Sequence, residues 1–89
     1  MKIQFEKRFL KDIKLLKDKN LKEEILTIIS QVENAKKLDE IKNLKKLKGF
    51  KNCYRIRTGD FRIGIYFQSN IIEFVVFGHR KSFYRYFPK

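Results

Sequence analysis

The chain has 89 residues, which is enough for one hydrophobic core, so residues 1–89 are expected to form a single domain. One Cys and one His exclude an internal disulfide and a zinc site, and the absence of a long apolar run predicts a cytoplasmic protein that neither carries a signal peptide nor crosses a membrane. The 22 Lys and Arg against 10 Asp and Glu give a net charge of +12, which predicts a negatively charged partner because such a chain otherwise repels itself.

The N-terminal half predicts a short strand followed by two helices. Residues 2–5 alternate between apolar and polar side chains, as a strand does. Apolar residues then recur at helical spacing, predicting a first helix from Lys7 to about Lys17 and, after an Asn20 N-cap, a second helix with an apolar stripe over 21–32. The two helices are expected to form an antiparallel pair on a sheet, and the Lys-rich stretch 36–49 to be irregular or a short 3₁₀ turn.

The C-terminal half predicts a three-strand antiparallel meander. Alternating residues over 53–57 and 61–67 and an apolar run over 71–77 are separated by turn residues. The apolar run indicates a central strand, buried on both faces. With the N-terminal strand, this is an α+β fold with a four-stranded sheet.

Side chains two apart on a strand share a face, so Arg55 and Arg57 point together. Across the tight hairpin, Arg62 is expected on the same open surface, beside Gly64, whose missing side chain leaves room for a ligand. Neighbouring guanidinium groups repel one another, and an anion between them reverses that effect. These three arginines therefore predict a phosphate site.

The two kinds of cation are distributed differently. Five of the six Arg lie between Arg55 and Arg85, whereas 14 of the 16 Lys precede Cys53. Arginine binds phosphate through a planar fork, so the arginines are interpreted as the site and the lysines as steering and backbone contacts. The alternative is that the arginines only pair with Asp60, Glu73 and acidic residues of the helices.

The last twelve residues combine cations with aromatic rings. They include His79 and two tyrosines, a composition that suits phosphate contacts and base stacking. Alternatively, Phe83, Tyr84 and Phe87 fold back over the sheet edge. The basic residues expected to contact RNA are Lys45, Lys46, Lys48, Lys51, Lys81 and Arg85.

Four segments in order resemble the RelE/ParE superfamily of bacterial and archaeal toxins, the toxins of type II toxin–antitoxin systems. They are Leu47-Lys48-Gly49, the run from Tyr54 to Ile63, Gly78-His79-Arg80-Lys81, and Tyr84-Arg85. The resemblance implies the RelE-like fold and a ribosome-dependent mRNA endonuclease. In such members the 2′-hydroxyl of the message attacks the adjacent phosphate, so that neither a metal nor a cofactor is needed.

The resemblance also assigns roles at the site. Arg55 and Arg57 occupy the positions of basic residues that orient the phosphate and assist the 2′-hydroxyl, and Arg62 corresponds to the residue that stabilises the transition-state charge. Arg80 protects or protonates the leaving 5′-oxygen. The residues assigned to catalysis are Arg55, Arg57, Arg62, Arg80, His79, Tyr84 and Tyr86.

Three questions stay open at this point. Either tyrosine can stack on the nucleotide, and His79 can be a general acid or base or can stabilise a turn. Because guanidinium is a poor proton acceptor, the base is the phosphate itself, His79 or a tyrosinate-like Tyr, or catalysis rests on charge stabilisation alone.

Two other functions are alternatives to the mRNA endonuclease. The first is a ParE-like toxin that binds DNA gyrase without nuclease activity, and the second is a plain basic RNA-binding module. The expected partners of the nuclease are the ribosome, mRNA and a cognate antitoxin. The antitoxin is expected to be acidic or amphipathic, because it neutralises the basic surface.

Overall fold

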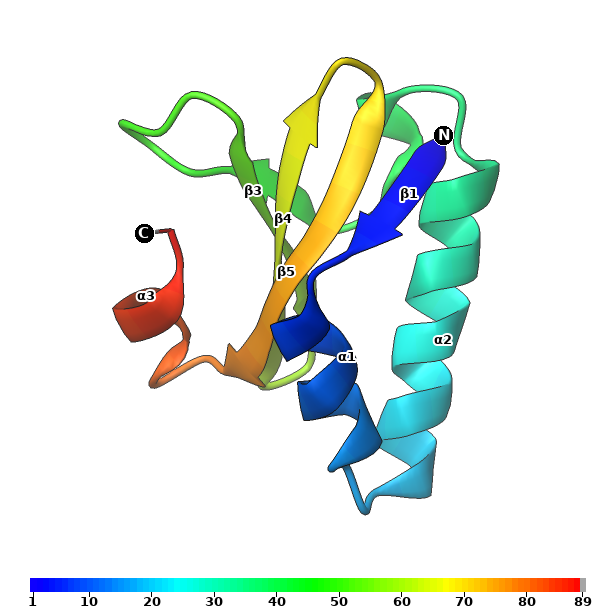
Figure 1. Cartoon of the computed structure of the whole chain (residues 1–89), viewed down its shortest axis with the longest axis vertical. Coiled ribbons are helices and arrows are strands. Elements are labelled where there is room, and N and C mark those ends of the chain that lie inside the picture. Colours follow the sequence, from blue (N-terminus) through cyan, green and yellow to red (C-terminus); the bar gives the residue numbers. More distant parts are fainter. Residues whose placement is uncertain (89) are drawn as a thin grey trace.

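A computed structural model describes residues 1–88 and contains one five-stranded sheet with three α-helices (Figure 1). The sheet order is β1-β5-β4-β3-β2, with β1 parallel to β5 and all other neighbours antiparallel. The elements are β1 (Lys2–Phe5), α1 (Lys7–Lys14), α2 (Lys19–Asn34), the 3₁₀ helix η1 (Leu38–Glu40), β2 (Leu44–Lys46), β3 (Cys53–Thr58), β4 (Phe61–Gln68), β5 (Ile71–His79) and α3 (Phe83–Tyr86).

The α+β class, the N-terminal strand and the antiparallel meander are confirmed, but the predicted count of four strands is wrong. The fifth strand, β2, pairs with β3 at the sheet edge through Leu44 opposite Ile56. It was missed because its apolar residue belongs to a series at helical spacing, Leu38, Ile41, Leu44 and Leu47. Only the first of these lies in the 3₁₀ turn that the sequence predicts.

The helix boundaries differ from the predicted ones at two points. α1 ends at Lys14 rather than Lys17, and the Leu16 N–H donates to the Ile13 carbonyl in a turn. The N-cap of α2 is Asp18, not Asn20, because the Asp18 carboxylate accepts a hydrogen bond from the Leu21 N–H at 3.1 Å. The linker between the helices is therefore short, and Figure 1 shows the two helices antiparallel.

The helices cover both faces of the sheet, but unequally. The main core lies between α1, α2 and one face, and contains Phe9, Ile25 and Val32 packed against the strands. A smaller cluster on the other face joins Cys53 and Val76 to Phe83 and Phe87 of the C-terminal segment. β5 is an interior strand with most of its residues buried or half-buried, as predicted, although β4 is the middle strand.

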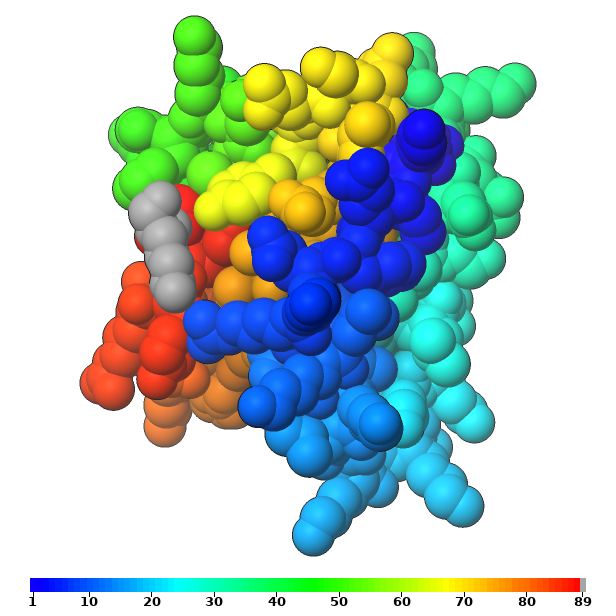
Figure 2. All heavy atoms as spheres, in the orientation of Figure 1, coloured from blue at the N-terminus to red at the C-terminus, as the bar shows by residue number. Residues whose placement is uncertain are grey.

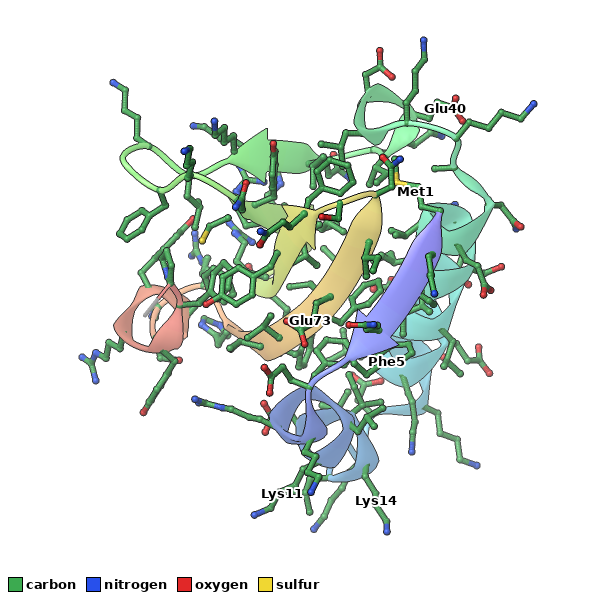
Figure 3. The ribbon with its side chains drawn as sticks, turned by 45° about the horizontal axis from the view of Figure 1, so that its top comes forward. Met1, Phe5, Lys11, Lys14, Glu40 and Glu73 are labelled. Carbon is green, nitrogen blue, oxygen red and sulfur yellow. The ribbon has the colours of Figure 1, made fainter. Side chains whose placement is uncertain are left out.

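The N-terminus is tied to the end of α2. The amino group of Met1 donates to the carbonyls of Glu33 and Ala35, and Figure 3 shows Met1 at that end of the helix. Among residues 1–88, no helix combines the length and the apolar character that a bilayer crossing requires.

Candidate nucleic-acid site

The open face of the hairpin carries the three predicted arginines. Arg57 lies directly opposite Arg62, and Arg55 lies opposite Gly64, so all three share one face. Their neighbours Ile56 and Ile63 point to the opposite face, into the main core. Strand alternation therefore predicted the placement of these three residues.

The three guanidinium groups are held differently. Arg62 Nη1 donates to the carbonyls of Gly59 and Phe61, both at 2.9 Å, and Arg55 Nη1 donates to the Asn43 carbonyl at 3.0 Å. The Arg57 side chain is exposed and has no hydrogen-bond or ion-pair partner within residues 1–88. Each guanidinium has five N–H donors, so all three keep donors for a ligand.

Arg80 joins this group from the turn after β5. Its backbone N–H donates to the Asp60 carbonyl at 2.7 Å, and its Nε lies 3.7 Å from Asp60 Oδ1. Both side chains are more than half exposed, so the ion pair contributes about 0–1 kcal/mol and can open for a stronger anion. Pairing with Asp60 thus occurs, as the alternative interpretation expected, but within the described chain it involves Arg80 alone among the four arginines.

Three of these arginines line one cleft of about 580 Å³ between α2 and the β3–β4 hairpin. Its cations are Lys42, Arg57, Arg62 and Arg80, and its acids are Glu24 and Asp60. Its apolar lining is Ile28, Val32, Ile41 and Ile56. Arg55 is not among the lining residues, and Lys42 is a member that sequence reasoning missed because it belongs to the preceding loop.

His79 is not among the residues that line the cleft, although its neighbour Arg80 is. His79 is opposite Phe61 in the β4–β5 register, so its side chain is on the core-facing side of the sheet, with the two rings edge to face at 5.4 Å. His79 Nδ1 accepts the Lys81 N–H at 3.2 Å. Of the two roles considered for His79, the structure contains the hydrogen bond of the turn.

The two tyrosines of α3 have different neighbours. The Arg8 guanidinium lies 4.7 Å above the Tyr86 ring, and Arg8 also pairs with Asp12 at 4.0 Å. Tyr84 packs edge to face on Phe83 and is 54% exposed. Neither tyrosine lines the cleft, and Tyr84 has the freer ring.

The predicted RNA-contacting cations are all exposed but do not form one patch. Lys45 lies opposite Arg55 and shares its face, whereas Lys46 lies opposite Tyr54 and points to the other side of the edge strand. The remaining four lie in the β2–β3 loop, after β5 and on α3: Lys48, Lys51, Lys81 and Arg85.

The prediction that Gly64 leaves room for a ligand is wrong. A Cβ atom at Gly64 would lie 2.7 Å from Cγ of Phe87, so the Phe87 ring already fills that space. Phe83 and Phe87 are both 1% exposed. The C-terminal segment thus folds back onto the sheet, as the alternative interpretation expected for Phe83 and Phe87. It covers the middle of the open face rather than the sheet edge, and Tyr84 stays exposed.

A second hollow, of about 520 Å³, lies on the open face of the sheet, where β3 begins and β4 ends. It is lined mainly by polar side chains, and Glu73 on β5 is its only carboxylate within residues 1–88 (Figure 3). Burial, and secondarily the nearby Glu6 carboxylate, raise the pKa of Glu73 above its ordinary value of 4.5.

We expect Glu73→Gln to raise the free energy of unfolding at neutral pH. Because the pKa is raised in the folded state, folding favours the protonated acid, and wild-type stability increases as the pH falls through the raised pKa. The advantage of the variant should therefore shrink towards pH 4.5. Urea unfolding at both pH values measures this, with Glu23→Gln on the exposed side of α2 as the control for net charge. If the stability advantage of Glu73→Gln did not change with pH, the raised pKa of Glu73 would not be its cause.

Known proteins share this chain's sequence and fold. The family of the ParE toxin of the type II toxin–antitoxin system parDE matches residues 3–84. The toxin RelE3 of Methanocaldococcus jannaschii is 43% identical over 89 residues, covering 99% of this chain and 100% of that protein. The chain belongs to the RelE/ParE toxin superfamily. The resemblance seen in the sequence is thus confirmed.

Solved structures of the superfamily agree with this membership. One chain of the RelB–RelE antitoxin–toxin complex from Methanococcus jannaschii superposes with a TM-score of 0.79 at 41% identity, covering 96% of this chain and 99% of that one. One chain of the E. coli RelBE complex gives a TM-score of 0.69 at 20% identity, covering 88% and 94%, and supports the fold alone. The chain is therefore a RelE-like toxin of a type II toxin–antitoxin system.

Proposed function

We propose that this toxin is a ribosome-dependent mRNA endonuclease whose phosphate site is the cleft between α2 and the β3–β4 hairpin. The observation that carries the proposal is the convergence of Arg57, Arg62 and Arg80 from three parts of the chain on one cleft. A phosphodiester carries one negative charge and gains a second in the pentacoordinate transition state, so its site needs such donors, whereas a protein-binding surface does not require them.

The reaction is attack of the message's 2′-hydroxyl on the adjacent phosphorus, with expulsion of the 5′-oxygen. In this scheme Arg57, which has free donors, orients the phosphate. Arg62, held by two backbone carbonyls, faces the charge that develops in the transition state. Arg80 exchanges its weak pair with Asp60 for the phosphate. In this scheme it stabilises the charge on the leaving 5′-oxygen, which takes up a proton from Arg80 or from water to become the 5′-hydroxyl.

The cleft itself offers proton acceptors that the arginines lack. Asp60 and Glu24 both line it, and Glu24 accepts a hydrogen bond from Thr58 Oγ1 at 3.3 Å. A carboxylate within one water molecule of the 2′-hydroxyl can take its proton. We therefore add these two residues to the possible bases, in preference to His79, whose Nδ1 is occupied in the turn.

A toxin of a type II system has a cognate antitoxin, and we propose such a protein as the partner of this chain. The related toxin from Methanococcus jannaschii is found in a RelB–RelE antitoxin–toxin complex. The +12 charge of this chain favours an acidic or amphipathic antitoxin. Leu10, Leu15 and Leu26 are exposed on and beside α1 and α2. Figure 3 shows Lys11 and Lys14 on the outer side of α1, and we expect the antitoxin to cover these apolar and basic side chains.

Primer extension on ribosome-bound messages after brief induction tests the function. We expect new message ends with the wild-type toxin and none with Arg62→Ala or Arg80→Ala. The matched family carries the ParE name, so DNA damage is followed in the same cultures. Unchanged message ends together with gyrase-dependent DNA damage would establish the gyrase alternative and reject the nuclease.

A further inference from the structure

The β2–β3 loop, residues 47–52, is ordered by its own hydrogen bonds. The Leu47 N–H donates to the Cys53 carbonyl at 2.9 Å, and the Phe50 N–H donates to the Leu47 carbonyl at 3.3 Å. Gly49 takes a φ of 81°, which favours glycine, and the Leu47 side chain packs against the smaller core cluster. The loop is thus anchored at its base and projects beyond the sheet (Figure 1).

This loop exposes an aromatic ring. Phe50 is 45% exposed, whereas the other eight Phe are buried or half-buried. Full burial of a Phe side chain stabilises a fold by about 1.5–3 kcal/mol, so folding forgoes much of that gain here. A single exposed apolar side chain is common on protein surfaces, so this ring indicates a binding surface only together with the charges around it.

The charge around Phe50 identifies the kind of partner. Lys46, Lys48 and Lys51 are all exposed beside it, and no acidic residue occurs between Ile41 and Gly59. The exposed aliphatic residues lie on and beside α1 and α2, and the other exposed aromatic residues, Tyr84 and Tyr86, lie on α3. Phe50 belongs to neither element, because it lies in the β2–β3 loop. An aromatic ring surrounded by lysines matches an unpaired base with its flanking phosphates.

We infer that the β2–β3 loop is a second RNA-binding point, at which Phe50 stacks on an unpaired base and Lys46, Lys48 and Lys51 contact phosphates. It is distinct from the cleft: Arg57, at the far end of β3, is roughly 13 Å along the strand from Cys53, where the loop ends. Figure 2 shows the loop, in green, at the edge of the molecule beside the C-terminal segment. The inference shares its RNA target with the proposed function, but requires no cleavage.

The chain contains no Trp, so Phe50→Trp introduces a single fluorophore at the proposed stacking position. We expect saturable quenching on titration with a single-stranded oligouridylate, weakening steeply as salt increases. Leu26→Trp is the matched control, since Leu26 is 55% exposed on α2, and its fluorescence should not change. No quenching at position 50, or equal quenching at both positions, would overturn the inference.

Two further measurements show whether the bound RNA is the message or ribosomal RNA, and distinguish this inference from the proposed endonuclease activity. Phe50→Ala should weaken oligonucleotide binding roughly 5- to 100-fold and Phe50→Tyr should not, since tyrosine also stacks. If the base belongs to the message, one strand contacts both the loop and the cleft. A dodecanucleotide, which can span both, should then bind Arg57→Ala more weakly than wild type, while a trinucleotide at the loop should bind both proteins equally. If it belongs to the ribosome, Phe50→Ala should lose ribosome binding instead. Quenching without any message cleavage would keep this inference and reject the endonuclease, whereas Phe50→Ala equal to wild type in all assays would reject the loop alone.

Discussion

Replacing Arg62 with alanine is expected to lower the rate constant for message cleavage on purified ribosomes by roughly 100- to 1000-fold, the usual loss for one preorganised transition-state donor. The reason is geometric. The Arg62 guanidinium is fixed by the Gly59 and Phe61 carbonyls, so it needs no reorganisation when charge develops on the phosphate. The measurement is single-turnover cleavage at saturating toxin, which separates chemistry from binding.

Two controls keep this prediction specific. Arg62→Lys retains the charge but loses the fork, so we expect an intermediate rate. Lys14→Ala removes the same charge from α1, where the side chain points away from the molecule (Figure 3), and should leave the rate unchanged. Because Arg62 also ties the hairpin together, thermal melting of each variant must show a folded protein. A folded Arg62→Ala toxin with the wild-type rate would exclude Arg62 from the reaction.

Strand alternation predicted which arginines share a face, because the side chains of a strand alternate with a fixed period and the hairpin turn sets the register. It could not predict the cleft. Arg80 reaches Asp60 only because β5 ends beside the β3–β4 turn, and Lys42 enters from the loop that precedes β2. Contacts of this kind depend on how the helices, strands and loops pack together, and a local sequence pattern does not specify that packing.

The C-terminal segment shows a different limit. Its mixture of cations and aromatic rings is compatible both with a ligand surface and with a hydrophobic cover, because Phe and Tyr serve either purpose. The structure divides the segment: Phe83 and Phe87 are buried, while Tyr84 and Tyr86 remain exposed. The spacing of four residues between the two buried rings, about one turn of helix, was the available signal.

Gly64→Ala is expected to destabilise the fold by about 1–3 kcal/mol, the usual cost of overpacking. The new Cβ would lie 2.7 Å from two atoms of the Phe87 ring, which is 1% exposed and has little space to move. The sign is informative, because in the absence of a clash alanine is favoured over glycine in a strand by roughly 0.5–1 kcal/mol. Gly78→Ala is the control: its Cβ would meet nothing closer than 4.0 Å, so this variant should be at least as stable as wild type.

A double-mutant cycle distinguishes the Phe87 contact from a general effect on β4. Phe87→Ala alone should cost roughly 3–5 kcal/mol, because it leaves a cavity. In the Phe87→Ala background the methyl group added by Gly64→Ala meets no ring, so its added cost should disappear. The destabilisation of the double mutant should therefore be smaller than the sum of the two single-mutant values by more than about 1 kcal/mol. Urea unfolding of the four proteins measures this. Additive effects would mean that Phe87 does not occupy the space above Gly64 in solution, and the middle of the open face would then be available to a ligand after all.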